Sequence, residues 1–203
     1  MPRWCYDEFS CNYRFKNAQY SMSSSTWKDS FVQGGIFEDS PAKSPLAGAT
    51  KAFVPYCTSD AWVGDAEAYG YQFRGQRIVA STLAAFVQKQ GLGSEPGHRL
   101  VFGGCSAGGR GASFNLDYVP QILSDAGAAF PVTVVGLFDA AMWVDIPPAL
   151  PGIVSQQCQT AALLDMVNAT HRLGDACVAA YPEPTEQWKV RCAACSHQQL
   201  PAL

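Results

Sequence analysis

The sequence predicts an α/β fold, in which the strands of a parallel sheet alternate with helices. Three segments have the composition or apolar character of strands, namely residues 51–56, 100–102 and 132–138. Residues 73–90 and 107–123, which lie between these segments, are expected to be helical. Because alternation of this kind is typical of parallel sheets, the 203 residues are interpreted as one α/β domain.

The first strand and the first helix form one unit. Residues 51–56 are aromatic and β-branched, and they end at a turn of polar residues. The helix that follows has apolar residues at helical spacing, and Gly91 marks its end. The stripe consists of Ile78, Val79, Leu83, Phe86 and Val87.

The next two strands lead to polar residues. Residues 100–102 form a short apolar run without alternation, which indicates a strand buried on both faces of a sheet. Residues 132–138 end at Asp139. Because ligands of parallel sheets bind beyond the carboxyl ends of the strands, four side chains are expected along that edge. They are Cys57, Asp60, Ser106 and Asp139.

The two ends of the chain carry weaker signals. The first fifty residues are rich in Ser, Gly, Asn, Asp and Pro, which predicts loop with short helical pieces. After Pro147-Pro148 the chain contains four cysteines and no clear strand, so helices and loops are expected.

Composition excludes several classes of function. The chain is 48% hydrophobic and 15% charged, with a net charge of −3, and it has no cluster of Lys and Arg. A nucleic-acid partner is therefore not indicated. No apolar run approaches the roughly 18 residues that a membrane span needs.

The eight cysteines and the sequon Asn168-Ala169-Thr170 favour an oxidising compartment. The first residues do not have the pattern of a signal peptide. Cys192, Cys195 and His197 lack the second ligand pair of a structural zinc site, so no metal is expected, and disulfide bonds are the favoured interpretation of the cysteines. Cys105 is interpreted as a small buried thiol.

The strongest catalytic signal is Gly104-Cys105-Ser106-Ala107-Gly108, which fits the G-x-S-x-G pattern of a serine nucleophile. In this pattern the serine occupies a strained turn between a strand and a helix, and the flanking residues must be small. Both neighbouring elements are predicted here. Two alternatives stay open, a Gly-rich corner without function and a phosphate-binding loop, although the latter lacks the G-K-[ST] tail.

A serine nucleophile also needs a histidine base and an acid. The histidines after Ser106 are His171 and His197, and neither follows a recognisable strand. Asp139 is the best internal candidate for the acid, although a strand-end Asp is often only a helix cap or loop anchor.

Several blocks of the sequence together resemble the pectin acetylesterase and Notum family. The blocks occur in the family's order and cover nearly the whole chain. They are Trp4-Cys5-Tyr6 with Cys11, Gly34-Gly35-Ile36, residues 56–64, Phe73-Arg74-Gly75, residues 104–109 and residues 139–145.

The resemblance implies a secreted, metal-independent and cofactor-free ester hydrolase of the α/β-hydrolase type. Ser106 takes the place of the nucleophile, and the backbone N–H groups of Ala107 and Trp4 match the oxyanion hole. Pro2-Arg3 stands where the family has glycines. The family's acid and base follow the region that this chain resembles, so a partial parallel sheet is expected, without its terminal strands and without those two residues.

The resulting expectation for residues 1–203 is an incomplete catalytic domain that removes acetyl or other acyl groups from a polysaccharide such as pectin, or from an acylated protein. One alternative is a self-sufficient hydrolase that uses Asp139 with His171 or His197. Another is a non-catalytic module that binds carbohydrate or protein. Trp62 and Trp143 are expected in the core or in the substrate pocket.

Overall fold

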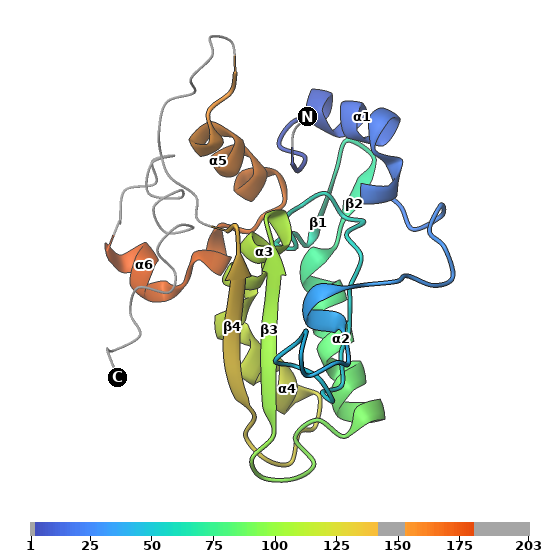
Figure 1. Ribbon diagram of the computed structural model, residues 1–203. Helices are drawn as coiled ribbons and strands as arrows, with labels where there is room; N and C mark the ends of the chain where they lie inside the picture. The colour runs from blue at the N-terminus through green and yellow to red at the C-terminus, as the bar shows by residue number, and fades with distance from the viewer. Residues whose placement is uncertain (1–2, 142–152, 181–203) are drawn as a thin grey trace.

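A parallel pair of strands forms the centre of the computed structural model, which describes residues 3–141 and 153–180. β3 (Arg99–Cys105) and β4 (Thr133–Asp139) lie side by side (Figure 1), in a register that sets Arg99 opposite Thr133 and Cys105 opposite Asp139. Helices flank this pair, so the α/β class is confirmed. The predictions for Trp143, Cys192, Cys195 and His197 lie outside the described residues.

Two helices cover one face of the strand pair. α2 (Gly75–Gln90) and α4 (Val119–Asp125) pack there through Leu83 and Leu123, against strand residues such as Phe102. α2 ends at Gly91 in the left-handed conformation, with φ of 71°, as the sequence predicts. The second predicted helix is instead three consecutive pieces, α3 (Ala107–Asn115), η3 (Leu116–Tyr118) and α4.

The other face of the strand pair carries exposed apolar side chains in this chain, so the prediction that residues 100–102 form a strand buried on both faces is wrong. Val101, Val135 and Leu137 are 42%, 51% and 42% exposed. Their side chains alternate with those that face α2 and α4, because successive residues of a strand point to opposite sides. An apolar run of three residues could not distinguish the two situations.

A second hydrophobic cluster joins segments that are distant in the sequence. Trp4 and Phe73 pack there with Phe114 of α3 and with Leu163 and Leu164 of α5 (Gln156–Met166). The chain continues from α5 into η4 (Thr170–Leu173) and α6 (Asp175–Ala180). This cluster holds the N-terminal residues against the end of β3, where Ser106 lies.

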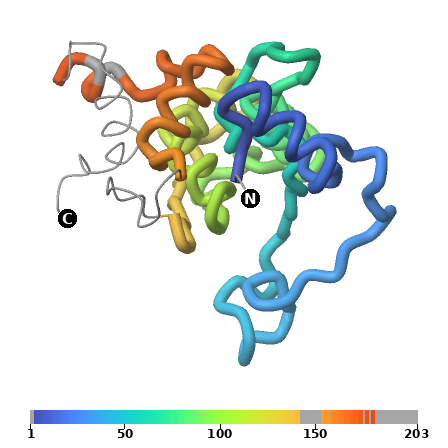
Figure 2. The backbone as a smooth tube through the Cα atoms, turned by 90° about the horizontal axis from the view of Figure 1, so that it is seen from above, coloured from blue at the N-terminus to red at the C-terminus, as the bar shows by residue number. Residues whose placement is uncertain are grey.

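The N-terminal region contains one regular helix and a long loop. α1 (Glu8–Asn17) begins with a capping box between Asp7 and Ser10. After η1 (Gln19–Ser21), only η2 (Gly35–Phe37) interrupts the loop, which leaves the body of the molecule and returns to it (Figure 2). The prediction of loop with helical pieces is therefore confirmed.

The prediction of a strand at residues 51–56 is wrong, because this segment does not pair with any strand in the described part of the chain. A strand requires a neighbour for its backbone hydrogen bonds, and composition alone does not supply one. Aromatic contacts hold the loop instead. The ring centroids of Phe31 and Phe53 are 6.1 Å apart, and those of Phe37 and Phe53 are 6.0 Å apart.

A hairpin that the sequence did not predict precedes α2. β1 (Ala66–Ala68) and β2 (Tyr71–Phe73) pair in antiparallel fashion through a two-residue turn. Tyr69 and Gly70 both have positive φ, 53° and 76°, as a type I′ turn requires. Tyr is an unusual residue at such a position, so the sequence carries no standard hairpin signal here.

Candidate active site

Ser106 occupies a sharp turn between β3 and α3, with φ of 56° and ψ of −121°. A residue other than glycine in this region costs about 1–3 kcal/mol, which the surrounding structure must offset. The Ser106 N–H donates to the carbonyl of Asp139 at 2.9 Å, and its own carbonyl accepts from the Arg110 N–H at 3.0 Å. No hydrogen bond joins its half-buried hydroxyl to the residues that the structure describes, so the hydroxyl is available for chemistry.

Glycines allow this turn to be so tight. A Cβ on Gly104 would lie 2.4 Å from the carbonyl carbon of Gly108, and one on Gly109 would lie 2.6 Å from the Ala141 Cβ. Gly108 itself has open space around the position of a Cβ. The steric requirement that the motif predicts on both sides of the serine is therefore present at Gly104 and absent at Gly108.

The N-terminal end of α3, which directly follows Ser106, provides backbone N–H donors. Ala107 is the first residue of α3, and its N–H is one of those that a helix leaves without an internal partner. Trp4 is 1% exposed and belongs to the same hydrophobic cluster as Ala107. Next to Trp4, the Cys5 N–H donates to the Ser59 carbonyl at 2.7 Å and fixes the backbone there.

Arg110 lies buried behind this end of the helix, and no sequence motif had indicated a role for it. Its guanidinium carbon is 5.1 Å from the centre of the Trp4 ring and 5.8 Å from that of Phe114. Burial lowers the pKa of Arg110 to about 9, so the side chain stays charged at neutral pH. A positive charge in the turn that follows Ser106 favours negative charge developing nearby.

Asp139 and Cys105 form a pair at the ends of β4 and β3. A hydrogen bond from the Cys105 thiol to Asp139, together with the negative charge of Asp139, raises the pKa of the thiol. Cys105 is exposed on the open face of the strands. The interpretation of Cys105 as a buried thiol is wrong, because β3 turns its odd-numbered residues away from the helices.

Neither histidine in the described part of the chain lies beside Ser106. His98 precedes β3, so roughly 20 Å of strand separates it from the nucleophile. His171 lies in η4, where its carbonyl accepts from the Tyr118 hydroxyl at 3.4 Å, and the next residue, Arg172, binds Asn115 at 2.7 Å. These contacts place His171 near the C-terminal end of α3, whereas Ser106 precedes the N-terminal end.

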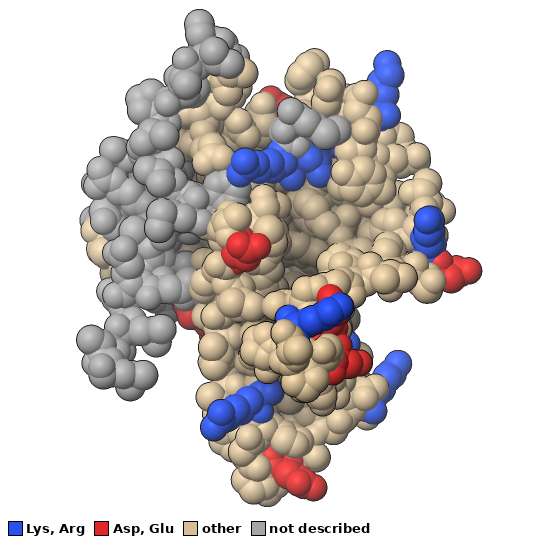
Figure 3. Space-filling view, viewed as in Figure 1, with Lys and Arg blue, Asp and Glu red and all other residues tan. Residues whose placement is uncertain are grey.

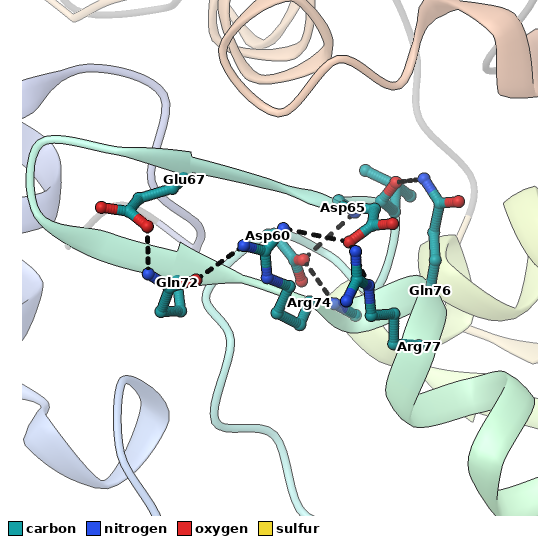
Figure 4. Close-up of polar contacts among 10 residues, drawn as sticks. Asp60, Asp65, Glu67, Gln72, Arg74, Gln76 and Arg77 are labelled. Carbon is teal, nitrogen blue, oxygen red and sulfur yellow. Dashed lines mark hydrogen bonds and ion pairs between the residues drawn. The ribbon is translucent and has the colours of Figure 1, made fainter.

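Asp60, expected along the edge of the sheet, does not offer its side chain to a ligand there. It is fully buried, and its carboxylate accepts backbone N–H groups of Trp62 at 2.9 Å, Gly64 at 3.1 Å and Gly75 at 2.9 Å. Burial raises the pKa of Asp60, while these donors lower it. Figure 4 shows it between the hairpin and the start of α2, close to the exposed pairing of Asp65 with the two arginines of that region. Its role here is structural.

Of the two positions expected for Trp62, the core and the substrate pocket, the structure supports the core. Trp62 is 7% exposed, its ring centroid lies 5.4 Å from that of Tyr56, and its carbonyl accepts from Asn115 of α3 at 2.9 Å. A shallow open groove of the described residues lies along α2 and includes neither Ser106 nor Trp4. Its lining consists of Arg77, Ile78, Ser81, Thr82 and Ala85.

Neither the face drawn in Figure 3 nor the metal-ligand types among the described residues offers a further site. Charged side chains are scattered over the face in Figure 3, with no continuous basic patch. Within residues 3–141 and 153–180, no three side chains of the His, Cys, Asp and Glu types cluster as metal ligands would. None of the helices in these ranges has the length and apolarity to cross a membrane.

Both states of cysteine occur among the described residues. Cys177 is disulfide-bonded, whereas five others are thiols. Cys5 and Cys11 are fully buried, and the hydrogen bond between them raises the pKa of Cys5. The other thiols are those of Cys57, Cys105 and Cys158.

The comparison with known proteins agrees with this geometry. The family model described as Pectinacetylesterase matches residues 2–194. The palmitoleoyl-protein carboxylesterase NOTUM of Drosophila melanogaster is 30% identical over 194 residues, which are 91% of this chain and 28% of that protein. The human protein of the same name is 31% identical over 147 residues, 70% of this chain and 29% of that protein.

A solved structure described as the Wnt deacylase Notum from Drosophila superposes with a TM-score of 0.85 and 28% sequence identity. The match covers 100% of this chain and 58% of that structure's chain. The chain thus spans less than a third of the length of the curated relatives that it matches. The sequence blocks, the parallel strand pair and the strained serine turn all have one explanation: the chain belongs to the pectinacetylesterase family.

Proposed function

We propose that this chain is the nucleophile-bearing part of a serine carboxylic ester hydrolase, with Ser106 as the nucleophile. The observation that carries the proposal is the strained turn at Ser106, whose hydroxyl has no hydrogen bond within the described residues. The N-terminal end of α3 lies directly behind it. Strain that leaves a reactive group unengaged is typical of catalytic positions.

The reaction has two steps. The Ser106 hydroxyl attacks the ester carbonyl and loses its proton to a base, while the N–H groups of Ala107 and Trp4 stabilise the oxyanion of the tetrahedral intermediate. The alcohol leaves with a proton, and an acyl group stays on Ser106 as an ester. Water then attacks this ester and releases the carboxylic acid, which regenerates the serine.

The base and the acid come from outside the described residues. His98 and His171 are both remote from Ser106, and the Asp139 carboxylate is engaged with Cys105. A serine without its base loses several orders of magnitude in rate and retains only the contribution of the oxyanion hole and of binding. We therefore expect the isolated chain to be a poor catalyst.

The substrate is an oxygen ester. The family description names an acetylesterase of pectin, which supports an acetylated polysaccharide as the first candidate substrate. An enzyme with this substrate would act in the cell wall or in another extracellular location. The names of the relatives support a second candidate, a palmitoleoyl group on a protein. Both substrates require the same chemistry at Ser106 and differ in the length of the acyl chain.

Labelling with a fluorophosphonate tests the nucleophile. This probe forms a covalent bond to an activated serine, and peptide mass spectrometry then locates the adduct. We expect label on Ser106 in a longer protein that extends this chain to the length of its relatives, no label in Ser106→Ala, and unchanged label in Ser81→Ala, which removes an exposed hydroxyl on α2. If the extended protein remains unlabelled, the alternative of a non-catalytic carbohydrate- or protein-binding module replaces the proposal.

Hydrolysis of p-nitrophenyl esters tests the source of the base. The chain of 203 residues is expected to turn over p-nitrophenyl acetate far more slowly than the extended protein. Turnover by the short chain that disappears in both Ser106→Ala and a single His variant would instead show a self-sufficient hydrolase. Comparison of acetyl with octanoyl esters in the extended protein then separates the two substrate classes.

A further inference from the structure

The turn after α5 carries a sequence that the proposed hydrolase chemistry does not use. Asn168-Ala169-Thr170 is a sequon for N-linked glycosylation. A glycan needs an acceptor that stays at the surface of the folded protein and a hydroxyl two residues later. The structure shows how both requirements relate to the local fold.

Asn168 terminates α5 in a Schellman motif. Its φ is 52°, its N–H donates to the Asp165 carbonyl at 3.2 Å, and the Ala169 N–H donates to the Leu164 carbonyl at 2.8 Å. Asn is, after Gly, the residue that most readily adopts this left-handed position. The backbone conformation thus explains why Asn or Gly occupies position 168, but it places no requirement on the side chain.

The two side chains of the sequon have no hydrogen-bonding role in the part of the chain that the structure describes. Asn168 is exposed, and no hydrogen bond of its carboxamide occurs there. Thr170 is half-buried at the start of η4, and no contact of its hydroxyl explains a threonine at this position. The left-handed cap accounts for an Asn at position 168, but no hydrogen bond of either side chain accounts for the combination of Asn168 with Thr170.

The flanking residues make this turn a firm attachment point. Val167 and Ala169 are both 0% exposed and belong to the hydrophobic cluster around Trp4. Asn168 is the exposed residue between them, so a group on its carboxamide extends into solvent without disturbing the cluster. Directly after the turn, Arg172 of η4 donates a hydrogen bond to Asn115 at the C-terminal end of α3. The length of α3, about 13 Å, separates Asn115 from Ser106.

We propose that Asn168 is the acceptor of an N-linked glycan. The co-reactant is an oligosaccharide carried on a lipid pyrophosphate. The carboxamide nitrogen attacks the first sugar carbon, a C–N bond forms, the bond from that carbon to the pyrophosphate oxygen breaks, and the nitrogen loses one proton. The proposal rests on passage of the chain through the secretory pathway and is independent of the hydrolase activity.

Translation of the full chain behind a cleavable secretion signal, in the presence of microsomes, tests this site. Chains that have entered the microsomes resist added protease, so glycosylation can be scored on them whether or not they fold. We expect these chains to carry one glycan that endoglycosidase H removes. Mass spectrometry after treatment with peptide-N-glycosidase should identify Asp at position 168.

Three variants separate the sequon from the cap. Asn168→Gly should abolish the glycan and preserve the left-handed turn, while Thr170→Val should abolish the glycan with the acceptor intact. Thr170→Ser should retain it. Protease-protected wild-type chains that lack a glycan, or an unchanged glycan in Asn168→Gly, would overturn the proposal. Neither result bears on Ser106, whose labelling is a separate measurement.

Discussion

Two turns that pack around α3 both hold non-glycine residues at positive φ, and they do so in different ways. At residues 59–62, Ser59, Ala61 and Trp62 have φ of 47°, 51° and 63°, and the buried carboxylate of Asp60 accepts the surrounding N–H groups. At Ser106, backbone hydrogen bonds with Asp139 and Arg110 hold the turn instead, and Gly104 leaves room for its tight path. The side chain of Asp60 is fully used, whereas no hydrogen bond to the described residues uses that of Ser106.

The difference separates structural strain from strain that serves chemistry. A turn held by its own side chain cannot offer that side chain to a substrate. A turn held by the backbone leaves the side chain available. Substitutions can test whether the turn at residues 59–62 depends on a side chain and the turn at Ser106 on the backbone.

The largest effect is expected from Asp60→Ala. The change leaves three backbone N–H groups in the interior without their acceptor, and we expect the free energy of unfolding to fall by about 3–5 kcal/mol. Urea denaturation followed by circular dichroism measures it. Asp65→Ala is the matched control, since Asp65 forms only partly exposed ion pairs with Arg74 and Arg77, and a loss of at most about 1 kcal/mol is expected. Equal losses in the two variants would remove the distinction.

The turn at Ser106 should respond to bulk in the backbone rather than to loss of a side chain. In Gly104→Ala the new Cβ meets the backbone of Gly108 at 2.4 Å, and a loss of about 1–3 kcal/mol is expected. Gly108→Ala has open space and lies in a helix, where replacing glycine contributes about 0.5–1 kcal/mol of stability. Thermal unfolding of both variants gives the comparison. A Gly104→Ala protein as stable as the wild type would show that the turn can shift enough to accept the added Cβ.

The pH dependence of stability should report on Asp60. Burial raises its pKa in the folded state above the value of about 3.9 in the unfolded chain. The folded state therefore binds the proton more tightly, so this contribution to stability is complete below pH ~3.9 and is lost as the pH rises through the folded-state pKa. Unfolding free energies of the wild type minus those of Asp60→Asn, which cannot titrate, should decline across this range. A difference that grows with pH would contradict the assignment.

The smallest effect concerns the thiol next to the nucleophile. Asp139 raises the pKa of the Cys105 thiol, so Asp139→Asn should increase the rate at which iodoacetamide alkylates Cys105. Peptide mass spectrometry of quenched samples follows the rate, with Cys158 as an internal reference because it is also an exposed thiol. An unchanged ratio of the two rates would show that the contact between Asp139 and Cys105 has no influence in solution.

The parts of the fold that sequence could predict are those with local causes. The helix that ends at Gly91 and the turn at Ser106 follow from spacing, from glycine and from small side chains. Residues 51–56 have the composition of a strand, but a strand depends on a neighbour that composition does not reveal. The hairpin has Gly70 at the second position of its turn, but Tyr69 at the first position is not a usual turn residue, so the sequence does not predict this hairpin.

The same limit applies to the candidate site. The motif identifies Ser106, because its spacing has a steric meaning within five residues. Arg110 lies only four residues further along, yet its importance comes from its position over the Trp4 ring, more than a hundred residues distant in the chain. The burial of Asp60 and the exposure of Cys105 depend in the same way on long-range packing.

The parallel pairing of β3 with β4 also sets the height of the nucleophile above the sheet. Cys105 lies opposite Asp139, and the next peptide group, that of Ser106, is held by the Asp139 carbonyl. A slip of β4 by one residue would exchange its inward and outward side chains and remove this support at the same time. The register of β4 against β3 therefore fixes where the backbone of Ser106, and with it the reactive oxygen, lies relative to the two strands.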